Sequence, residues 1–161
     1  MAKSTGPFKR LVIPAAQQKE TAELLQQNLV HLVDLALLLK QAHWNVIGSH
    51  FRAVHLQLDE IIVTVRDASD ETAERISTLG IAPDGRSTTV AKRTSLHSYP
   101  DGFQKVDATL SLIADALNQT IGGLREAIKK LGDLDPISED MFIGIAGGLE
   151  KHLWMVQAQE V

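Results

Sequence analysis

The chain has 161 residues, of which 44% are apolar, 22% are charged and only 4% are aromatic, and its formal net charge is −4. This balance fits one globular domain whose Leu, Ile, Val and Ala content favours helices over sheets. The sequence has no apolar run close to the roughly 18 residues of a membrane span and no apolar stretch of a signal peptide at its start. It also has no cysteine, which excludes disulfides and thiolate metal sites. We therefore expect a cytoplasmic protein that does not enter the membrane.

The start of the chain differs from the rest in charge and in proline content. Pro7 and Pro14 disfavour a helix, so residues 1–16 are expected to form a flexible tail ahead of one domain at residues 17–161. The first nineteen residues hold no acid and four basic residues, which are Lys3, Lys9, Arg10 and Lys19. A basic tail is compatible with contacts to nucleic acid or to a membrane surface, and equally with a solubilising role alone.

Apolar residues then recur at helical spacing in four segments. The expected helices span residues 17–46, 50–79, 103–131 and 137–159. Gly48 is placed to end the first helix and Ser49 to cap the second. Residues 81–101 form a long connection, and one short helix is expected at residues 90–96. We therefore predict an all-α fold, a four-helix bundle whose crossover between the second and third helices carries a short helix.

The residues that suggest chemistry lie between positions 40 and 75. His43 lies five residues before Gly48, and His55 lies seven residues after it. If the two helices form a hairpin at this glycine, each histidine lies about 7–10 Å along its helix from the turn, and the rings can face each other. Three acids share the arc of the second helix that carries His55, away from its core stripe: Asp59, Asp70 and Glu74.

The spacing of these acids limits what one chain can do. Asp59 and Asp70 are separated by about 16 Å along a helix axis, whereas metal–ligand bonds are about 2.0–2.2 Å long. One ion therefore cannot reach both acids in a single chain. An antiparallel second copy, with a two-fold axis near residues 64–65, would bring Asp70 and Glu74 of the partner opposite the His55 end of the helix. The pattern predicts a metal site between two subunits.

Two imidazoles with carboxylates and no thiolate suit Fe(II), and also Mn, Co or Zn. An alternative is that these acids are simply solvated or salt-bridged. A different kind of iron site, inside one four-helix bundle, needs Glu-x-x-His pairs on two helices, and the sequence contains none. Three further histidines have no partner at ligand spacing and are expected to be hydrogen-bonded or exposed: His31, His97 and His152.

Several short motifs point to a known family. The first is the run His43-Trp44-Asn45, followed at the family's spacing by Gly48, Phe51, His55, Asp59, Asp70 and Glu74. The others are Leu96-His97-Ser98-Tyr99-Pro100 before the third helix and Leu153-Trp154 near the end. With these motifs the sequence resembles the Dps family of starvation miniferritins, in the ferritin-like superfamily, over nearly the whole chain from about residue 20.

The resemblance implies a hollow shell of twelve subunits, built from two-fold dimers, with a ferroxidase site at each dimer interface. On matched positions, His43 and His55 would come from one chain, and Asp70 and Glu74 would come from its partner. Asp59 matches a further acidic position of the site. The implied activity is the oxidation of Fe(II), preferably by hydrogen peroxide, and the storage of Fe(III) as a mineral, which protects DNA from oxidative damage.

The resemblance also bears on residues outside the ligand set. Trp44 lies next to the site in relatives, although its pattern alone suggests a core aromatic. The family's three-fold pores are lined by acids near the start of the fourth helix. The matching positions are Asp135 and Asp140, with Asp133 or Glu139 as alternatives. The same acids would also suit turn and helix-start positions.

The alternative function is a DNA-compacting shell that is mainly structural. Some members of the family bind DNA through basic tails, and several copies of the tail on one shell would bind phosphates multivalently. Such a protein would be associated with the nucleoid. The acidic body of the chain and the small number of tail charges argue against this function.

Overall fold

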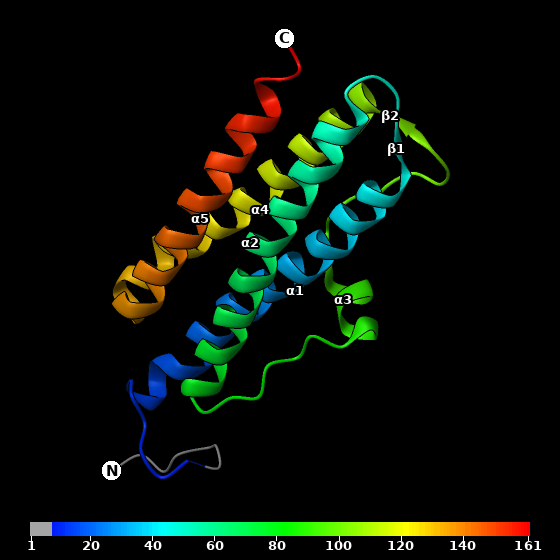
Figure 1. Ribbon diagram of the computed structural model, residues 1–161. Helices are drawn as coiled ribbons and strands as arrows, with labels where there is room; N and C mark the ends of the chain where they lie inside the picture. Colours follow the sequence, from blue (N-terminus) through cyan, green and yellow to red (C-terminus); the bar gives the residue numbers. More distant parts are fainter. Residues whose placement is uncertain (1–7) are drawn as a thin grey trace.

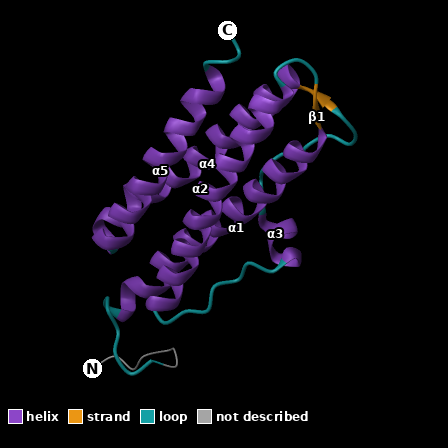
Figure 2. Ribbon diagram, viewed as in Figure 1, coloured by secondary structure: helices purple, strands orange, loops and turns teal. Residues whose placement is uncertain are grey.

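Five helices and two short strands make up residues 8–161, which the computed structural model describes. The helices are α1 (Ala15–Asn45), α2 (Phe51–Thr78), α3 (Ser87–Arg93), α4 (Val106–Leu134) and α5 (Pro136–Gln157), and the strands are β1 (Val46–Ile47) and β2 (Gln104–Lys105). The four long helices lie side by side as a bundle, and α3 lies in the crossover between α2 and α4 (Figure 1). Figure 2 shows how little of the chain is strand. The predicted all-α fold with its long crossover is confirmed.

The expected tail falls partly outside the described residues, because residues 1–7, with Lys3, are not among them. The described residues that precede α1 have no regular secondary structure, and α1 begins at Ala15, two residues before the expected start. Helix α1 has the length and composition of a membrane span, and 67% of the matching window is buried inside the bundle. It is therefore placed as the core helix of a folded domain would be.

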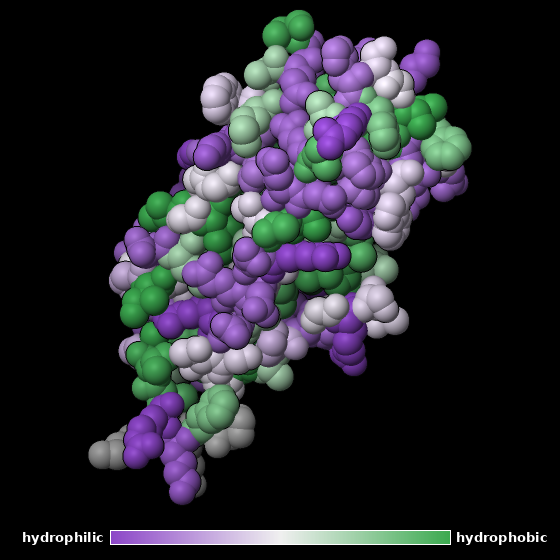
Figure 3. All heavy atoms as spheres, viewed as in Figure 1, coloured by the Kyte–Doolittle hydropathy of each residue, from purple (hydrophilic) through white to green (hydrophobic). Residues whose placement is uncertain are grey.

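The bundle core is built from the apolar residues that recur every three or four positions along each long helix. Helix α1 packs most extensively against α2, α4 packs most extensively against α5, and α1 also contacts α4. The largest fully buried side chains are Phe142, Leu25, Leu32, Leu35, Leu39, Ile61, Ile76, Leu79, Ile113, Leu117, Leu124 and Leu131. Each of them contributes about 1.5–3 kcal/mol relative to an exposed side chain, and together they hold the α1–α2 and α4–α5 hairpins against each other. On the face of the molecule in Figure 3, polar and apolar side chains are interspersed.

The turn between α1 and α2 contains two residues in the left-handed region. Gly48 has a φ of 115° and His50 a φ of 63°. Glycine adopts this region freely, whereas a residue with a Cβ is strained by about 1–2 kcal/mol. Helix α2 begins at Phe51 with His50 at the N-cap position, and no side chain caps it. The expectation that Ser49 caps this helix is therefore wrong.

Strands β1 and β2 form a parallel pair that the sequence analysis did not anticipate. Val46 pairs with Gln104, and Ile47 pairs with Lys105. The pair ties the α1–α2 turn to the start of α4, because each strand directly adjoins one of these elements. The end of the bundle that carries His43 and His55 is thereby held by backbone pairing as well as by side-chain packing.

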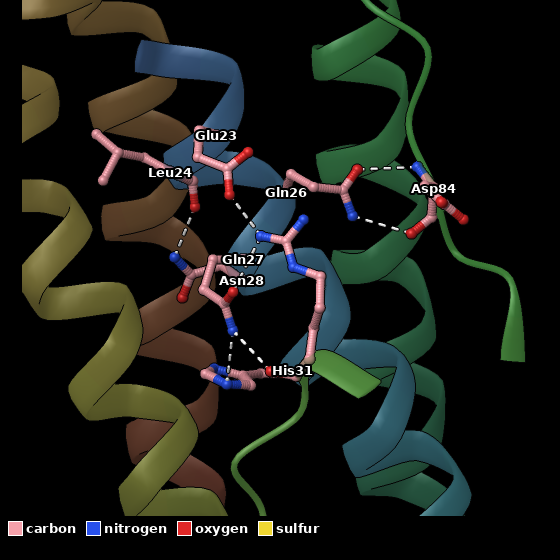
Figure 4. Close-up of polar contacts among 8 residues, drawn as sticks. Glu23, Leu24, Gln26, Gln27, Asn28, His31 and Asp84 are labelled. Carbon is pink, nitrogen blue, oxygen red and sulfur yellow. Dashed lines mark hydrogen bonds and ion pairs between the residues drawn. The ribbon is translucent and has the colours of Figure 1, made fainter. Parts of the chain in front are cut away.

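The other end of the crossover is attached to α1 by side chains. Gln26 Nε2 donates to the Asp84 carbonyl at 2.9 Å, and the Asp84 amide donates to Gln26 Oε1 at 2.8 Å (Figure 4). Arg93 at the end of α3 forms an ion pair with Glu23 at 2.5 Å. Helix α3 begins at Ser87, three residues before the expected short helix. These contacts fix the crossover along α1.

Candidate metal centre

Three of the five predicted ligands lie together where α1 and α2 meet. His43 lies on the last turn of α1, and His55 and Asp59 are four residues apart near the start of α2. One possible ligand atom from each of these residues lies within 4.8 Å of the other two. Within residues 8–161 this is the one group of three or more such side chains at metal-binding distance. The hairpin at Gly48 therefore produces the expected approach of the two histidines.

The two imidazoles are held by reciprocal hydrogen bonds to backbone carbonyls. His43 Nδ1 donates to the His55 carbonyl at 3.0 Å, and His55 Nδ1 donates to the His43 carbonyl at 2.9 Å. Since a carbonyl oxygen only accepts, both rings carry their proton on Nδ1 and keep the Nε2 lone pair for a ligand. The rings are stacked, with centroids 3.6 Å apart. Both imidazoles are thus oriented by the backbone of the other helix.

Asp59 is the anionic member of the cluster. Its Oδ1 lies 2.8 Å from Lys40 Nζ and 3.4 Å from His43 Nδ1. The hydrogen bond from Lys40 is the largest cause that lowers the pKa of Asp59, and the nearby His43 and His55 lower it further. Asp59 is therefore a carboxylate at neutral pH, and its side chain is 46% exposed. Its exposed part remains open to a further cation.

Asp70 and Glu74 lie outside this cluster. Both are exposed on α2, beyond the cluster toward the C-terminal end of the helix. At 1.5 Å per residue, Asp70 lies about 16 Å along the axis from Asp59. A single chain therefore divides the five predicted ligands into two groups, with two imidazoles and one carboxylate in one place and two carboxylates in another.

The cluster adjoins large apolar side chains that one chain leaves exposed. Trp44 follows His43 and is 65% exposed, so the core position suggested by its pattern is wrong. Ile47 and Phe51 come from the same turn and are also exposed. The Phe51 ring lies 5.1 Å from the His55 ring, centroid to centroid. The group of His43, His55 and Asp59 thus lies next to exposed apolar side chains.

Lys40 is the residue of this site that sequence reasoning missed. Its position three residues before His43 places both side chains on one face of α1, and this spacing was the available signal. Its contact with Asp59 depends on how α1 crosses α2, because nineteen residues separate the two along the chain.

The two predicted pore acids differ in exposure. Asp135 is only 2% exposed and forms an ion pair with Arg75 at 2.6 Å, and Ser138 also donates to its carboxylate. Burial raises the pKa of Asp135, but the hydrogen bonds from Arg75 and Ser138 outweigh this and lower it overall. Asp140 is exposed near the start of α5. Both pore assignments stay predictions, and the buried ion pair argues against the one for Asp135.

The remaining histidines lie apart from the group of His43, His55 and Asp59. His31 is buried, with Nε2 at 3.1 Å from Gln27 Nε2 and 3.2 Å from Ser95 Oγ. His152 Nε2 lies 2.9 Å from Thr64 Oγ1. His97 is exposed. This placement agrees with the expectation of hydrogen-bonded or exposed histidines.

Comparison with known proteins gives matches over most of the chain. Residues 22–160 match the model of the ferritin-like domain. The chain is 43% identical over 137 residues to the fine tangled pili major subunit of Haemophilus ducreyi, which covers 85% of this chain and 72% of that protein. It is 40% identical over 149 residues to the DNA protection during starvation protein of Mycolicibacterium smegmatis, which covers 91% of this chain and 81% of that protein.

The fold comparison gives the same result. The solved structure of Mycobacterium smegmatis Dps in a tetragonal form superposes with a TM-score of 0.90 at 38% identity, covering 94% of this chain and 92% of that chain. Sequence and fold therefore agree over nearly the whole length. The chain belongs to the Dps family of ferritin-like proteins.

Proposed function

We propose that this chain is a ferroxidase and iron-storage subunit of a homo-oligomeric shell. Fe(II) binds at a site shared by two subunits, is oxidised, preferably by hydrogen peroxide, and is stored as a Fe(III) mineral inside a hollow dodecamer built from two-fold dimers. By consuming iron and peroxide together in the cytoplasm, the shell protects DNA from oxidative damage.

The observation that carries this proposal is the cluster of His43, His55 and Asp59, whose ligand atoms lie within 4.8 Å of one another. Two imidazoles and one carboxylate with open positions around the ion are typical of non-haem Fe(II) sites. The same ligands also suit Zn, Mn and Co, which are expected competitors. The open positions leave room for peroxide and for carboxylates from a second subunit.

The sharing of the site between subunits rests on the exposure of Asp70 and Glu74 and on their distance from the cluster. An antiparallel α2 from a second copy would supply both carboxylates to the histidine end. Hard oxygen ligands favour the higher charge of Fe(III), so the partner's acids would stabilise the oxidised product.

The oxidation needs two Fe(II) ions for each hydrogen peroxide. Each Fe(II) gives one electron to the peroxide, the O–O bond breaks, and two protons are taken up to form two water molecules.

The proposal is tested by loading the protein with Fe(II) without oxygen, adding peroxide and following ferric absorbance and soluble iron. Wild type should oxidise iron rapidly and keep it in solution, whereas the His43→Ala/His55→Ala variant should lose both properties because its nitrogen ligands are gone. His97→Ala, which removes an exposed histidine away from the cluster, is the matched control. Equally slow oxidation in wild type and double variant would refute the ferroxidase function.

A second function, non-specific DNA binding, is supported by the basic residues at the start of the chain. Lys9 and Arg10 are exposed ahead of α1, and Lys19 is exposed near the start of this helix. Their repetition on a multi-subunit shell would let weak phosphate contacts act together. We propose this as an addition to iron oxidation, because the rest of the chain is acidic.

A further inference from the structure

A pocket of about 370 Å³ lies between α1 and α4, apart from the candidate metal centre. Asn28 and His31 of α1 and Gly123 of α4 are among the residues that line it. His31 precedes His43 by twelve residues, which corresponds to about 18 Å along the helix axis. The volume lies within the range of about 300–1,000 Å³ that is usual for small-molecule sites.

Two buried side chains of this pocket each have a polar atom without a hydrogen-bond partner. Asn28 is 4% exposed and His31 is 8% exposed, and within residues 8–161 neither Asn28 Oδ1 nor His31 Nδ1 has a partner. The other amide atom of Asn28, Nδ2, donates to the Leu24 carbonyl at 2.9 Å, which leaves Oδ1 as an acceptor (Figure 4). Buried polar atoms are rarely left unpaired, because the loss of their contact with water costs stability. The two atoms therefore indicate a place where a ligand is bound.

The neighbours of His31 determine which of its ring nitrogens carries the proton. Arg93 Nη2 donates to Gln27 Oε1 at 3.1 Å, so Gln27 Nε2 directs an N–H at His31 Nε2, 3.1 Å away (Figure 4). Gln119 Nε2 donates to Ser95 Oγ at 3.1 Å, which leaves the Ser95 hydroxyl proton for His31 Nε2, 3.2 Å away. Burial lowers the pKa of His31, so the ring is neutral at neutral pH. Its one proton is therefore on Nδ1, which is a hydrogen-bond donor.

Gly123 is the point of α4 that approaches both unpartnered atoms. A Cβ at this position would lie 3.2 Å from Asn28 Oδ1 and 3.4 Å from His31 Nδ1. Glycine in a helix interior is less favourable than alanine, and here the missing side chain leaves space beside both atoms. A donor and an acceptor are thereby presented next to each other in the pocket.

The charges around the pocket favour a neutral ligand. The exposed residues of its lining include Glu23, Glu126 and Lys130, and both acids are in ion pairs with basic residues at 2.5 Å. A carboxylate or phosphate ligand would bring no hydrogen to Asn28 Oδ1, and a metal ion would meet a proton on His31 Nδ1 instead of a lone pair. A neutral group with a donor and an acceptor on neighbouring atoms satisfies both side chains.

We propose that this pocket binds a small neutral molecule through a primary carboxamide. The carboxamide oxygen accepts the hydrogen bond from His31 Nδ1, and the carboxamide NH₂ group donates to Asn28 Oδ1. The rest of the molecule packs against the apolar side chains of Leu24 and Ala127, which also line the pocket. The site contains none of the five candidate iron ligands, so it does not depend on the proposed function.

The test uses nicotinamide, a primary carboxamide on a flat ring, titrated into the full-length protein and followed by saturation-transfer NMR. Wild type should bind nicotinamide at least tenfold more tightly than nicotinic acid, whose carboxylate has no hydrogen for Asn28 Oδ1. Gly123→Ala should weaken nicotinamide binding about tenfold or more, because its methyl group covers both polar atoms. Gly122→Ala, whose Cβ would meet nothing within 4 Å, is the matched control and should bind as wild type.

Asn28→Leu is a second variant, which adds no side chain at Gly123. It should lose nicotinamide binding and raise the urea midpoint, because a buried acceptor without a partner is removed. Circular dichroism checks that each variant is folded.

Three results would overturn the inference. If wild type binds nicotinamide no better than nicotinic acid, the pocket holds only water. If wild type, Gly123→Ala and Asn28→Leu bind nicotinamide equally, the carboxamide binds elsewhere. If Gly123→Ala changes the mass of the assembly in light scattering while wild type binds no nicotinamide, the pocket holds a side chain of another copy instead of a free molecule.

Discussion

His31 and His152 are titratable groups that lie apart from the His43–His55–Asp59 cluster; His31 is buried and His152 is partly buried. Burial is the largest cause that lowers the pKa of both below the ordinary value of 6.5, although Asp34 raises that of His31 and Glu60 that of His152. Each ring is in hydrogen-bond contact through Nε2, His31 with Gln27 and His152 with Thr64. Both histidines therefore bind a proton less readily in the folded chain than in the unfolded chain.

We predict that the protein loses stability as the pH falls through 6.5. Above that value both histidines are neutral in either state, and below it the unfolded chain takes up protons first, which favours unfolding. The urea midpoint of wild type should fall between pH 7.5 and pH 5.5. It should fall less in the His31→Gln/His152→Gln variant. An equal fall in both proteins would show that other groups cause the acid sensitivity.

The candidate ligands His43, His55 and Asp59 show how far single residues could be predicted from the sequence. The approach of His55 and Asp59 follows from helix geometry alone, and that of His43 needs only the position of the turn at Gly48. The contact of Lys40 with Asp59 depends on the crossing and rotation of two helices. Hydrophobic spacing leaves these quantities undefined, so the contact appears only in the folded molecule.

At the scale of elements, the start of α2 is the strained point of the hairpin that positions the cluster. His50 has a φ of 63°, is exposed, and has no side-chain capping bond. Its neighbour Gly48 adopts a φ of 115° at no steric cost. The turn therefore places one residue with a Cβ where glycine would be more favourable.

We predict that His50→Gly raises the free energy of unfolding by about 1 kcal/mol, because the left-handed conformation is no longer strained. The gain should be visible as a higher urea midpoint. Ser49→Gly, at a neighbouring exposed position without a positive φ, should bring no such gain. A loss of stability in His50→Gly would mean that the imidazole makes a stabilising contact that outweighs the strain.

The elements themselves were predictable to different degrees. The four long helices carry many turns of apolar periodicity, and α1 begins within two residues of the expected position. Helix α3 has seven residues and one buried side chain, Val90, so too little periodicity marks its start. Strands β1 and β2 have two residues each and are separated along the chain by α2 and the whole crossover. No local pattern can predict such a pairing.

At the scale of the whole molecule, two features of one chain bear on the proposed assembly. The chain leaves Trp44, Phe51 and Val63 exposed, and it separates Asp70 and Glu74 from the histidines that they are proposed to serve. In the proposed assembly, a second copy of the chain would account for both features.

DNA binding would be a property of the assembled molecule rather than of one tail. We predict that Lys3→Gln/Lys9→Gln/Arg10→Gln abolishes gel retardation of duplex DNA at low salt and leaves iron oxidation unchanged, because the proposed shell would repeat the tail charges on every subunit. Lys92→Gln, which removes an exposed basic residue of α3, is the control and should retain any retardation. If wild type causes none, or if the tail variant retards DNA as wild type does, the tails do not bind DNA.

The paired bonds between each histidine ring and the other histidine's carbonyl have a consequence for how the protein is made. Many small metal proteins acquire their shape only when the ion arrives. Here the backbone selects the tautomer of both rings, and the fold has a large buried apolar core of its own. We therefore expect that a cell short of iron still produces the folded chain with both histidine rings in place. On the proposed function, the rate of iron capture would then depend on the delivery of the ion and not on a folding step.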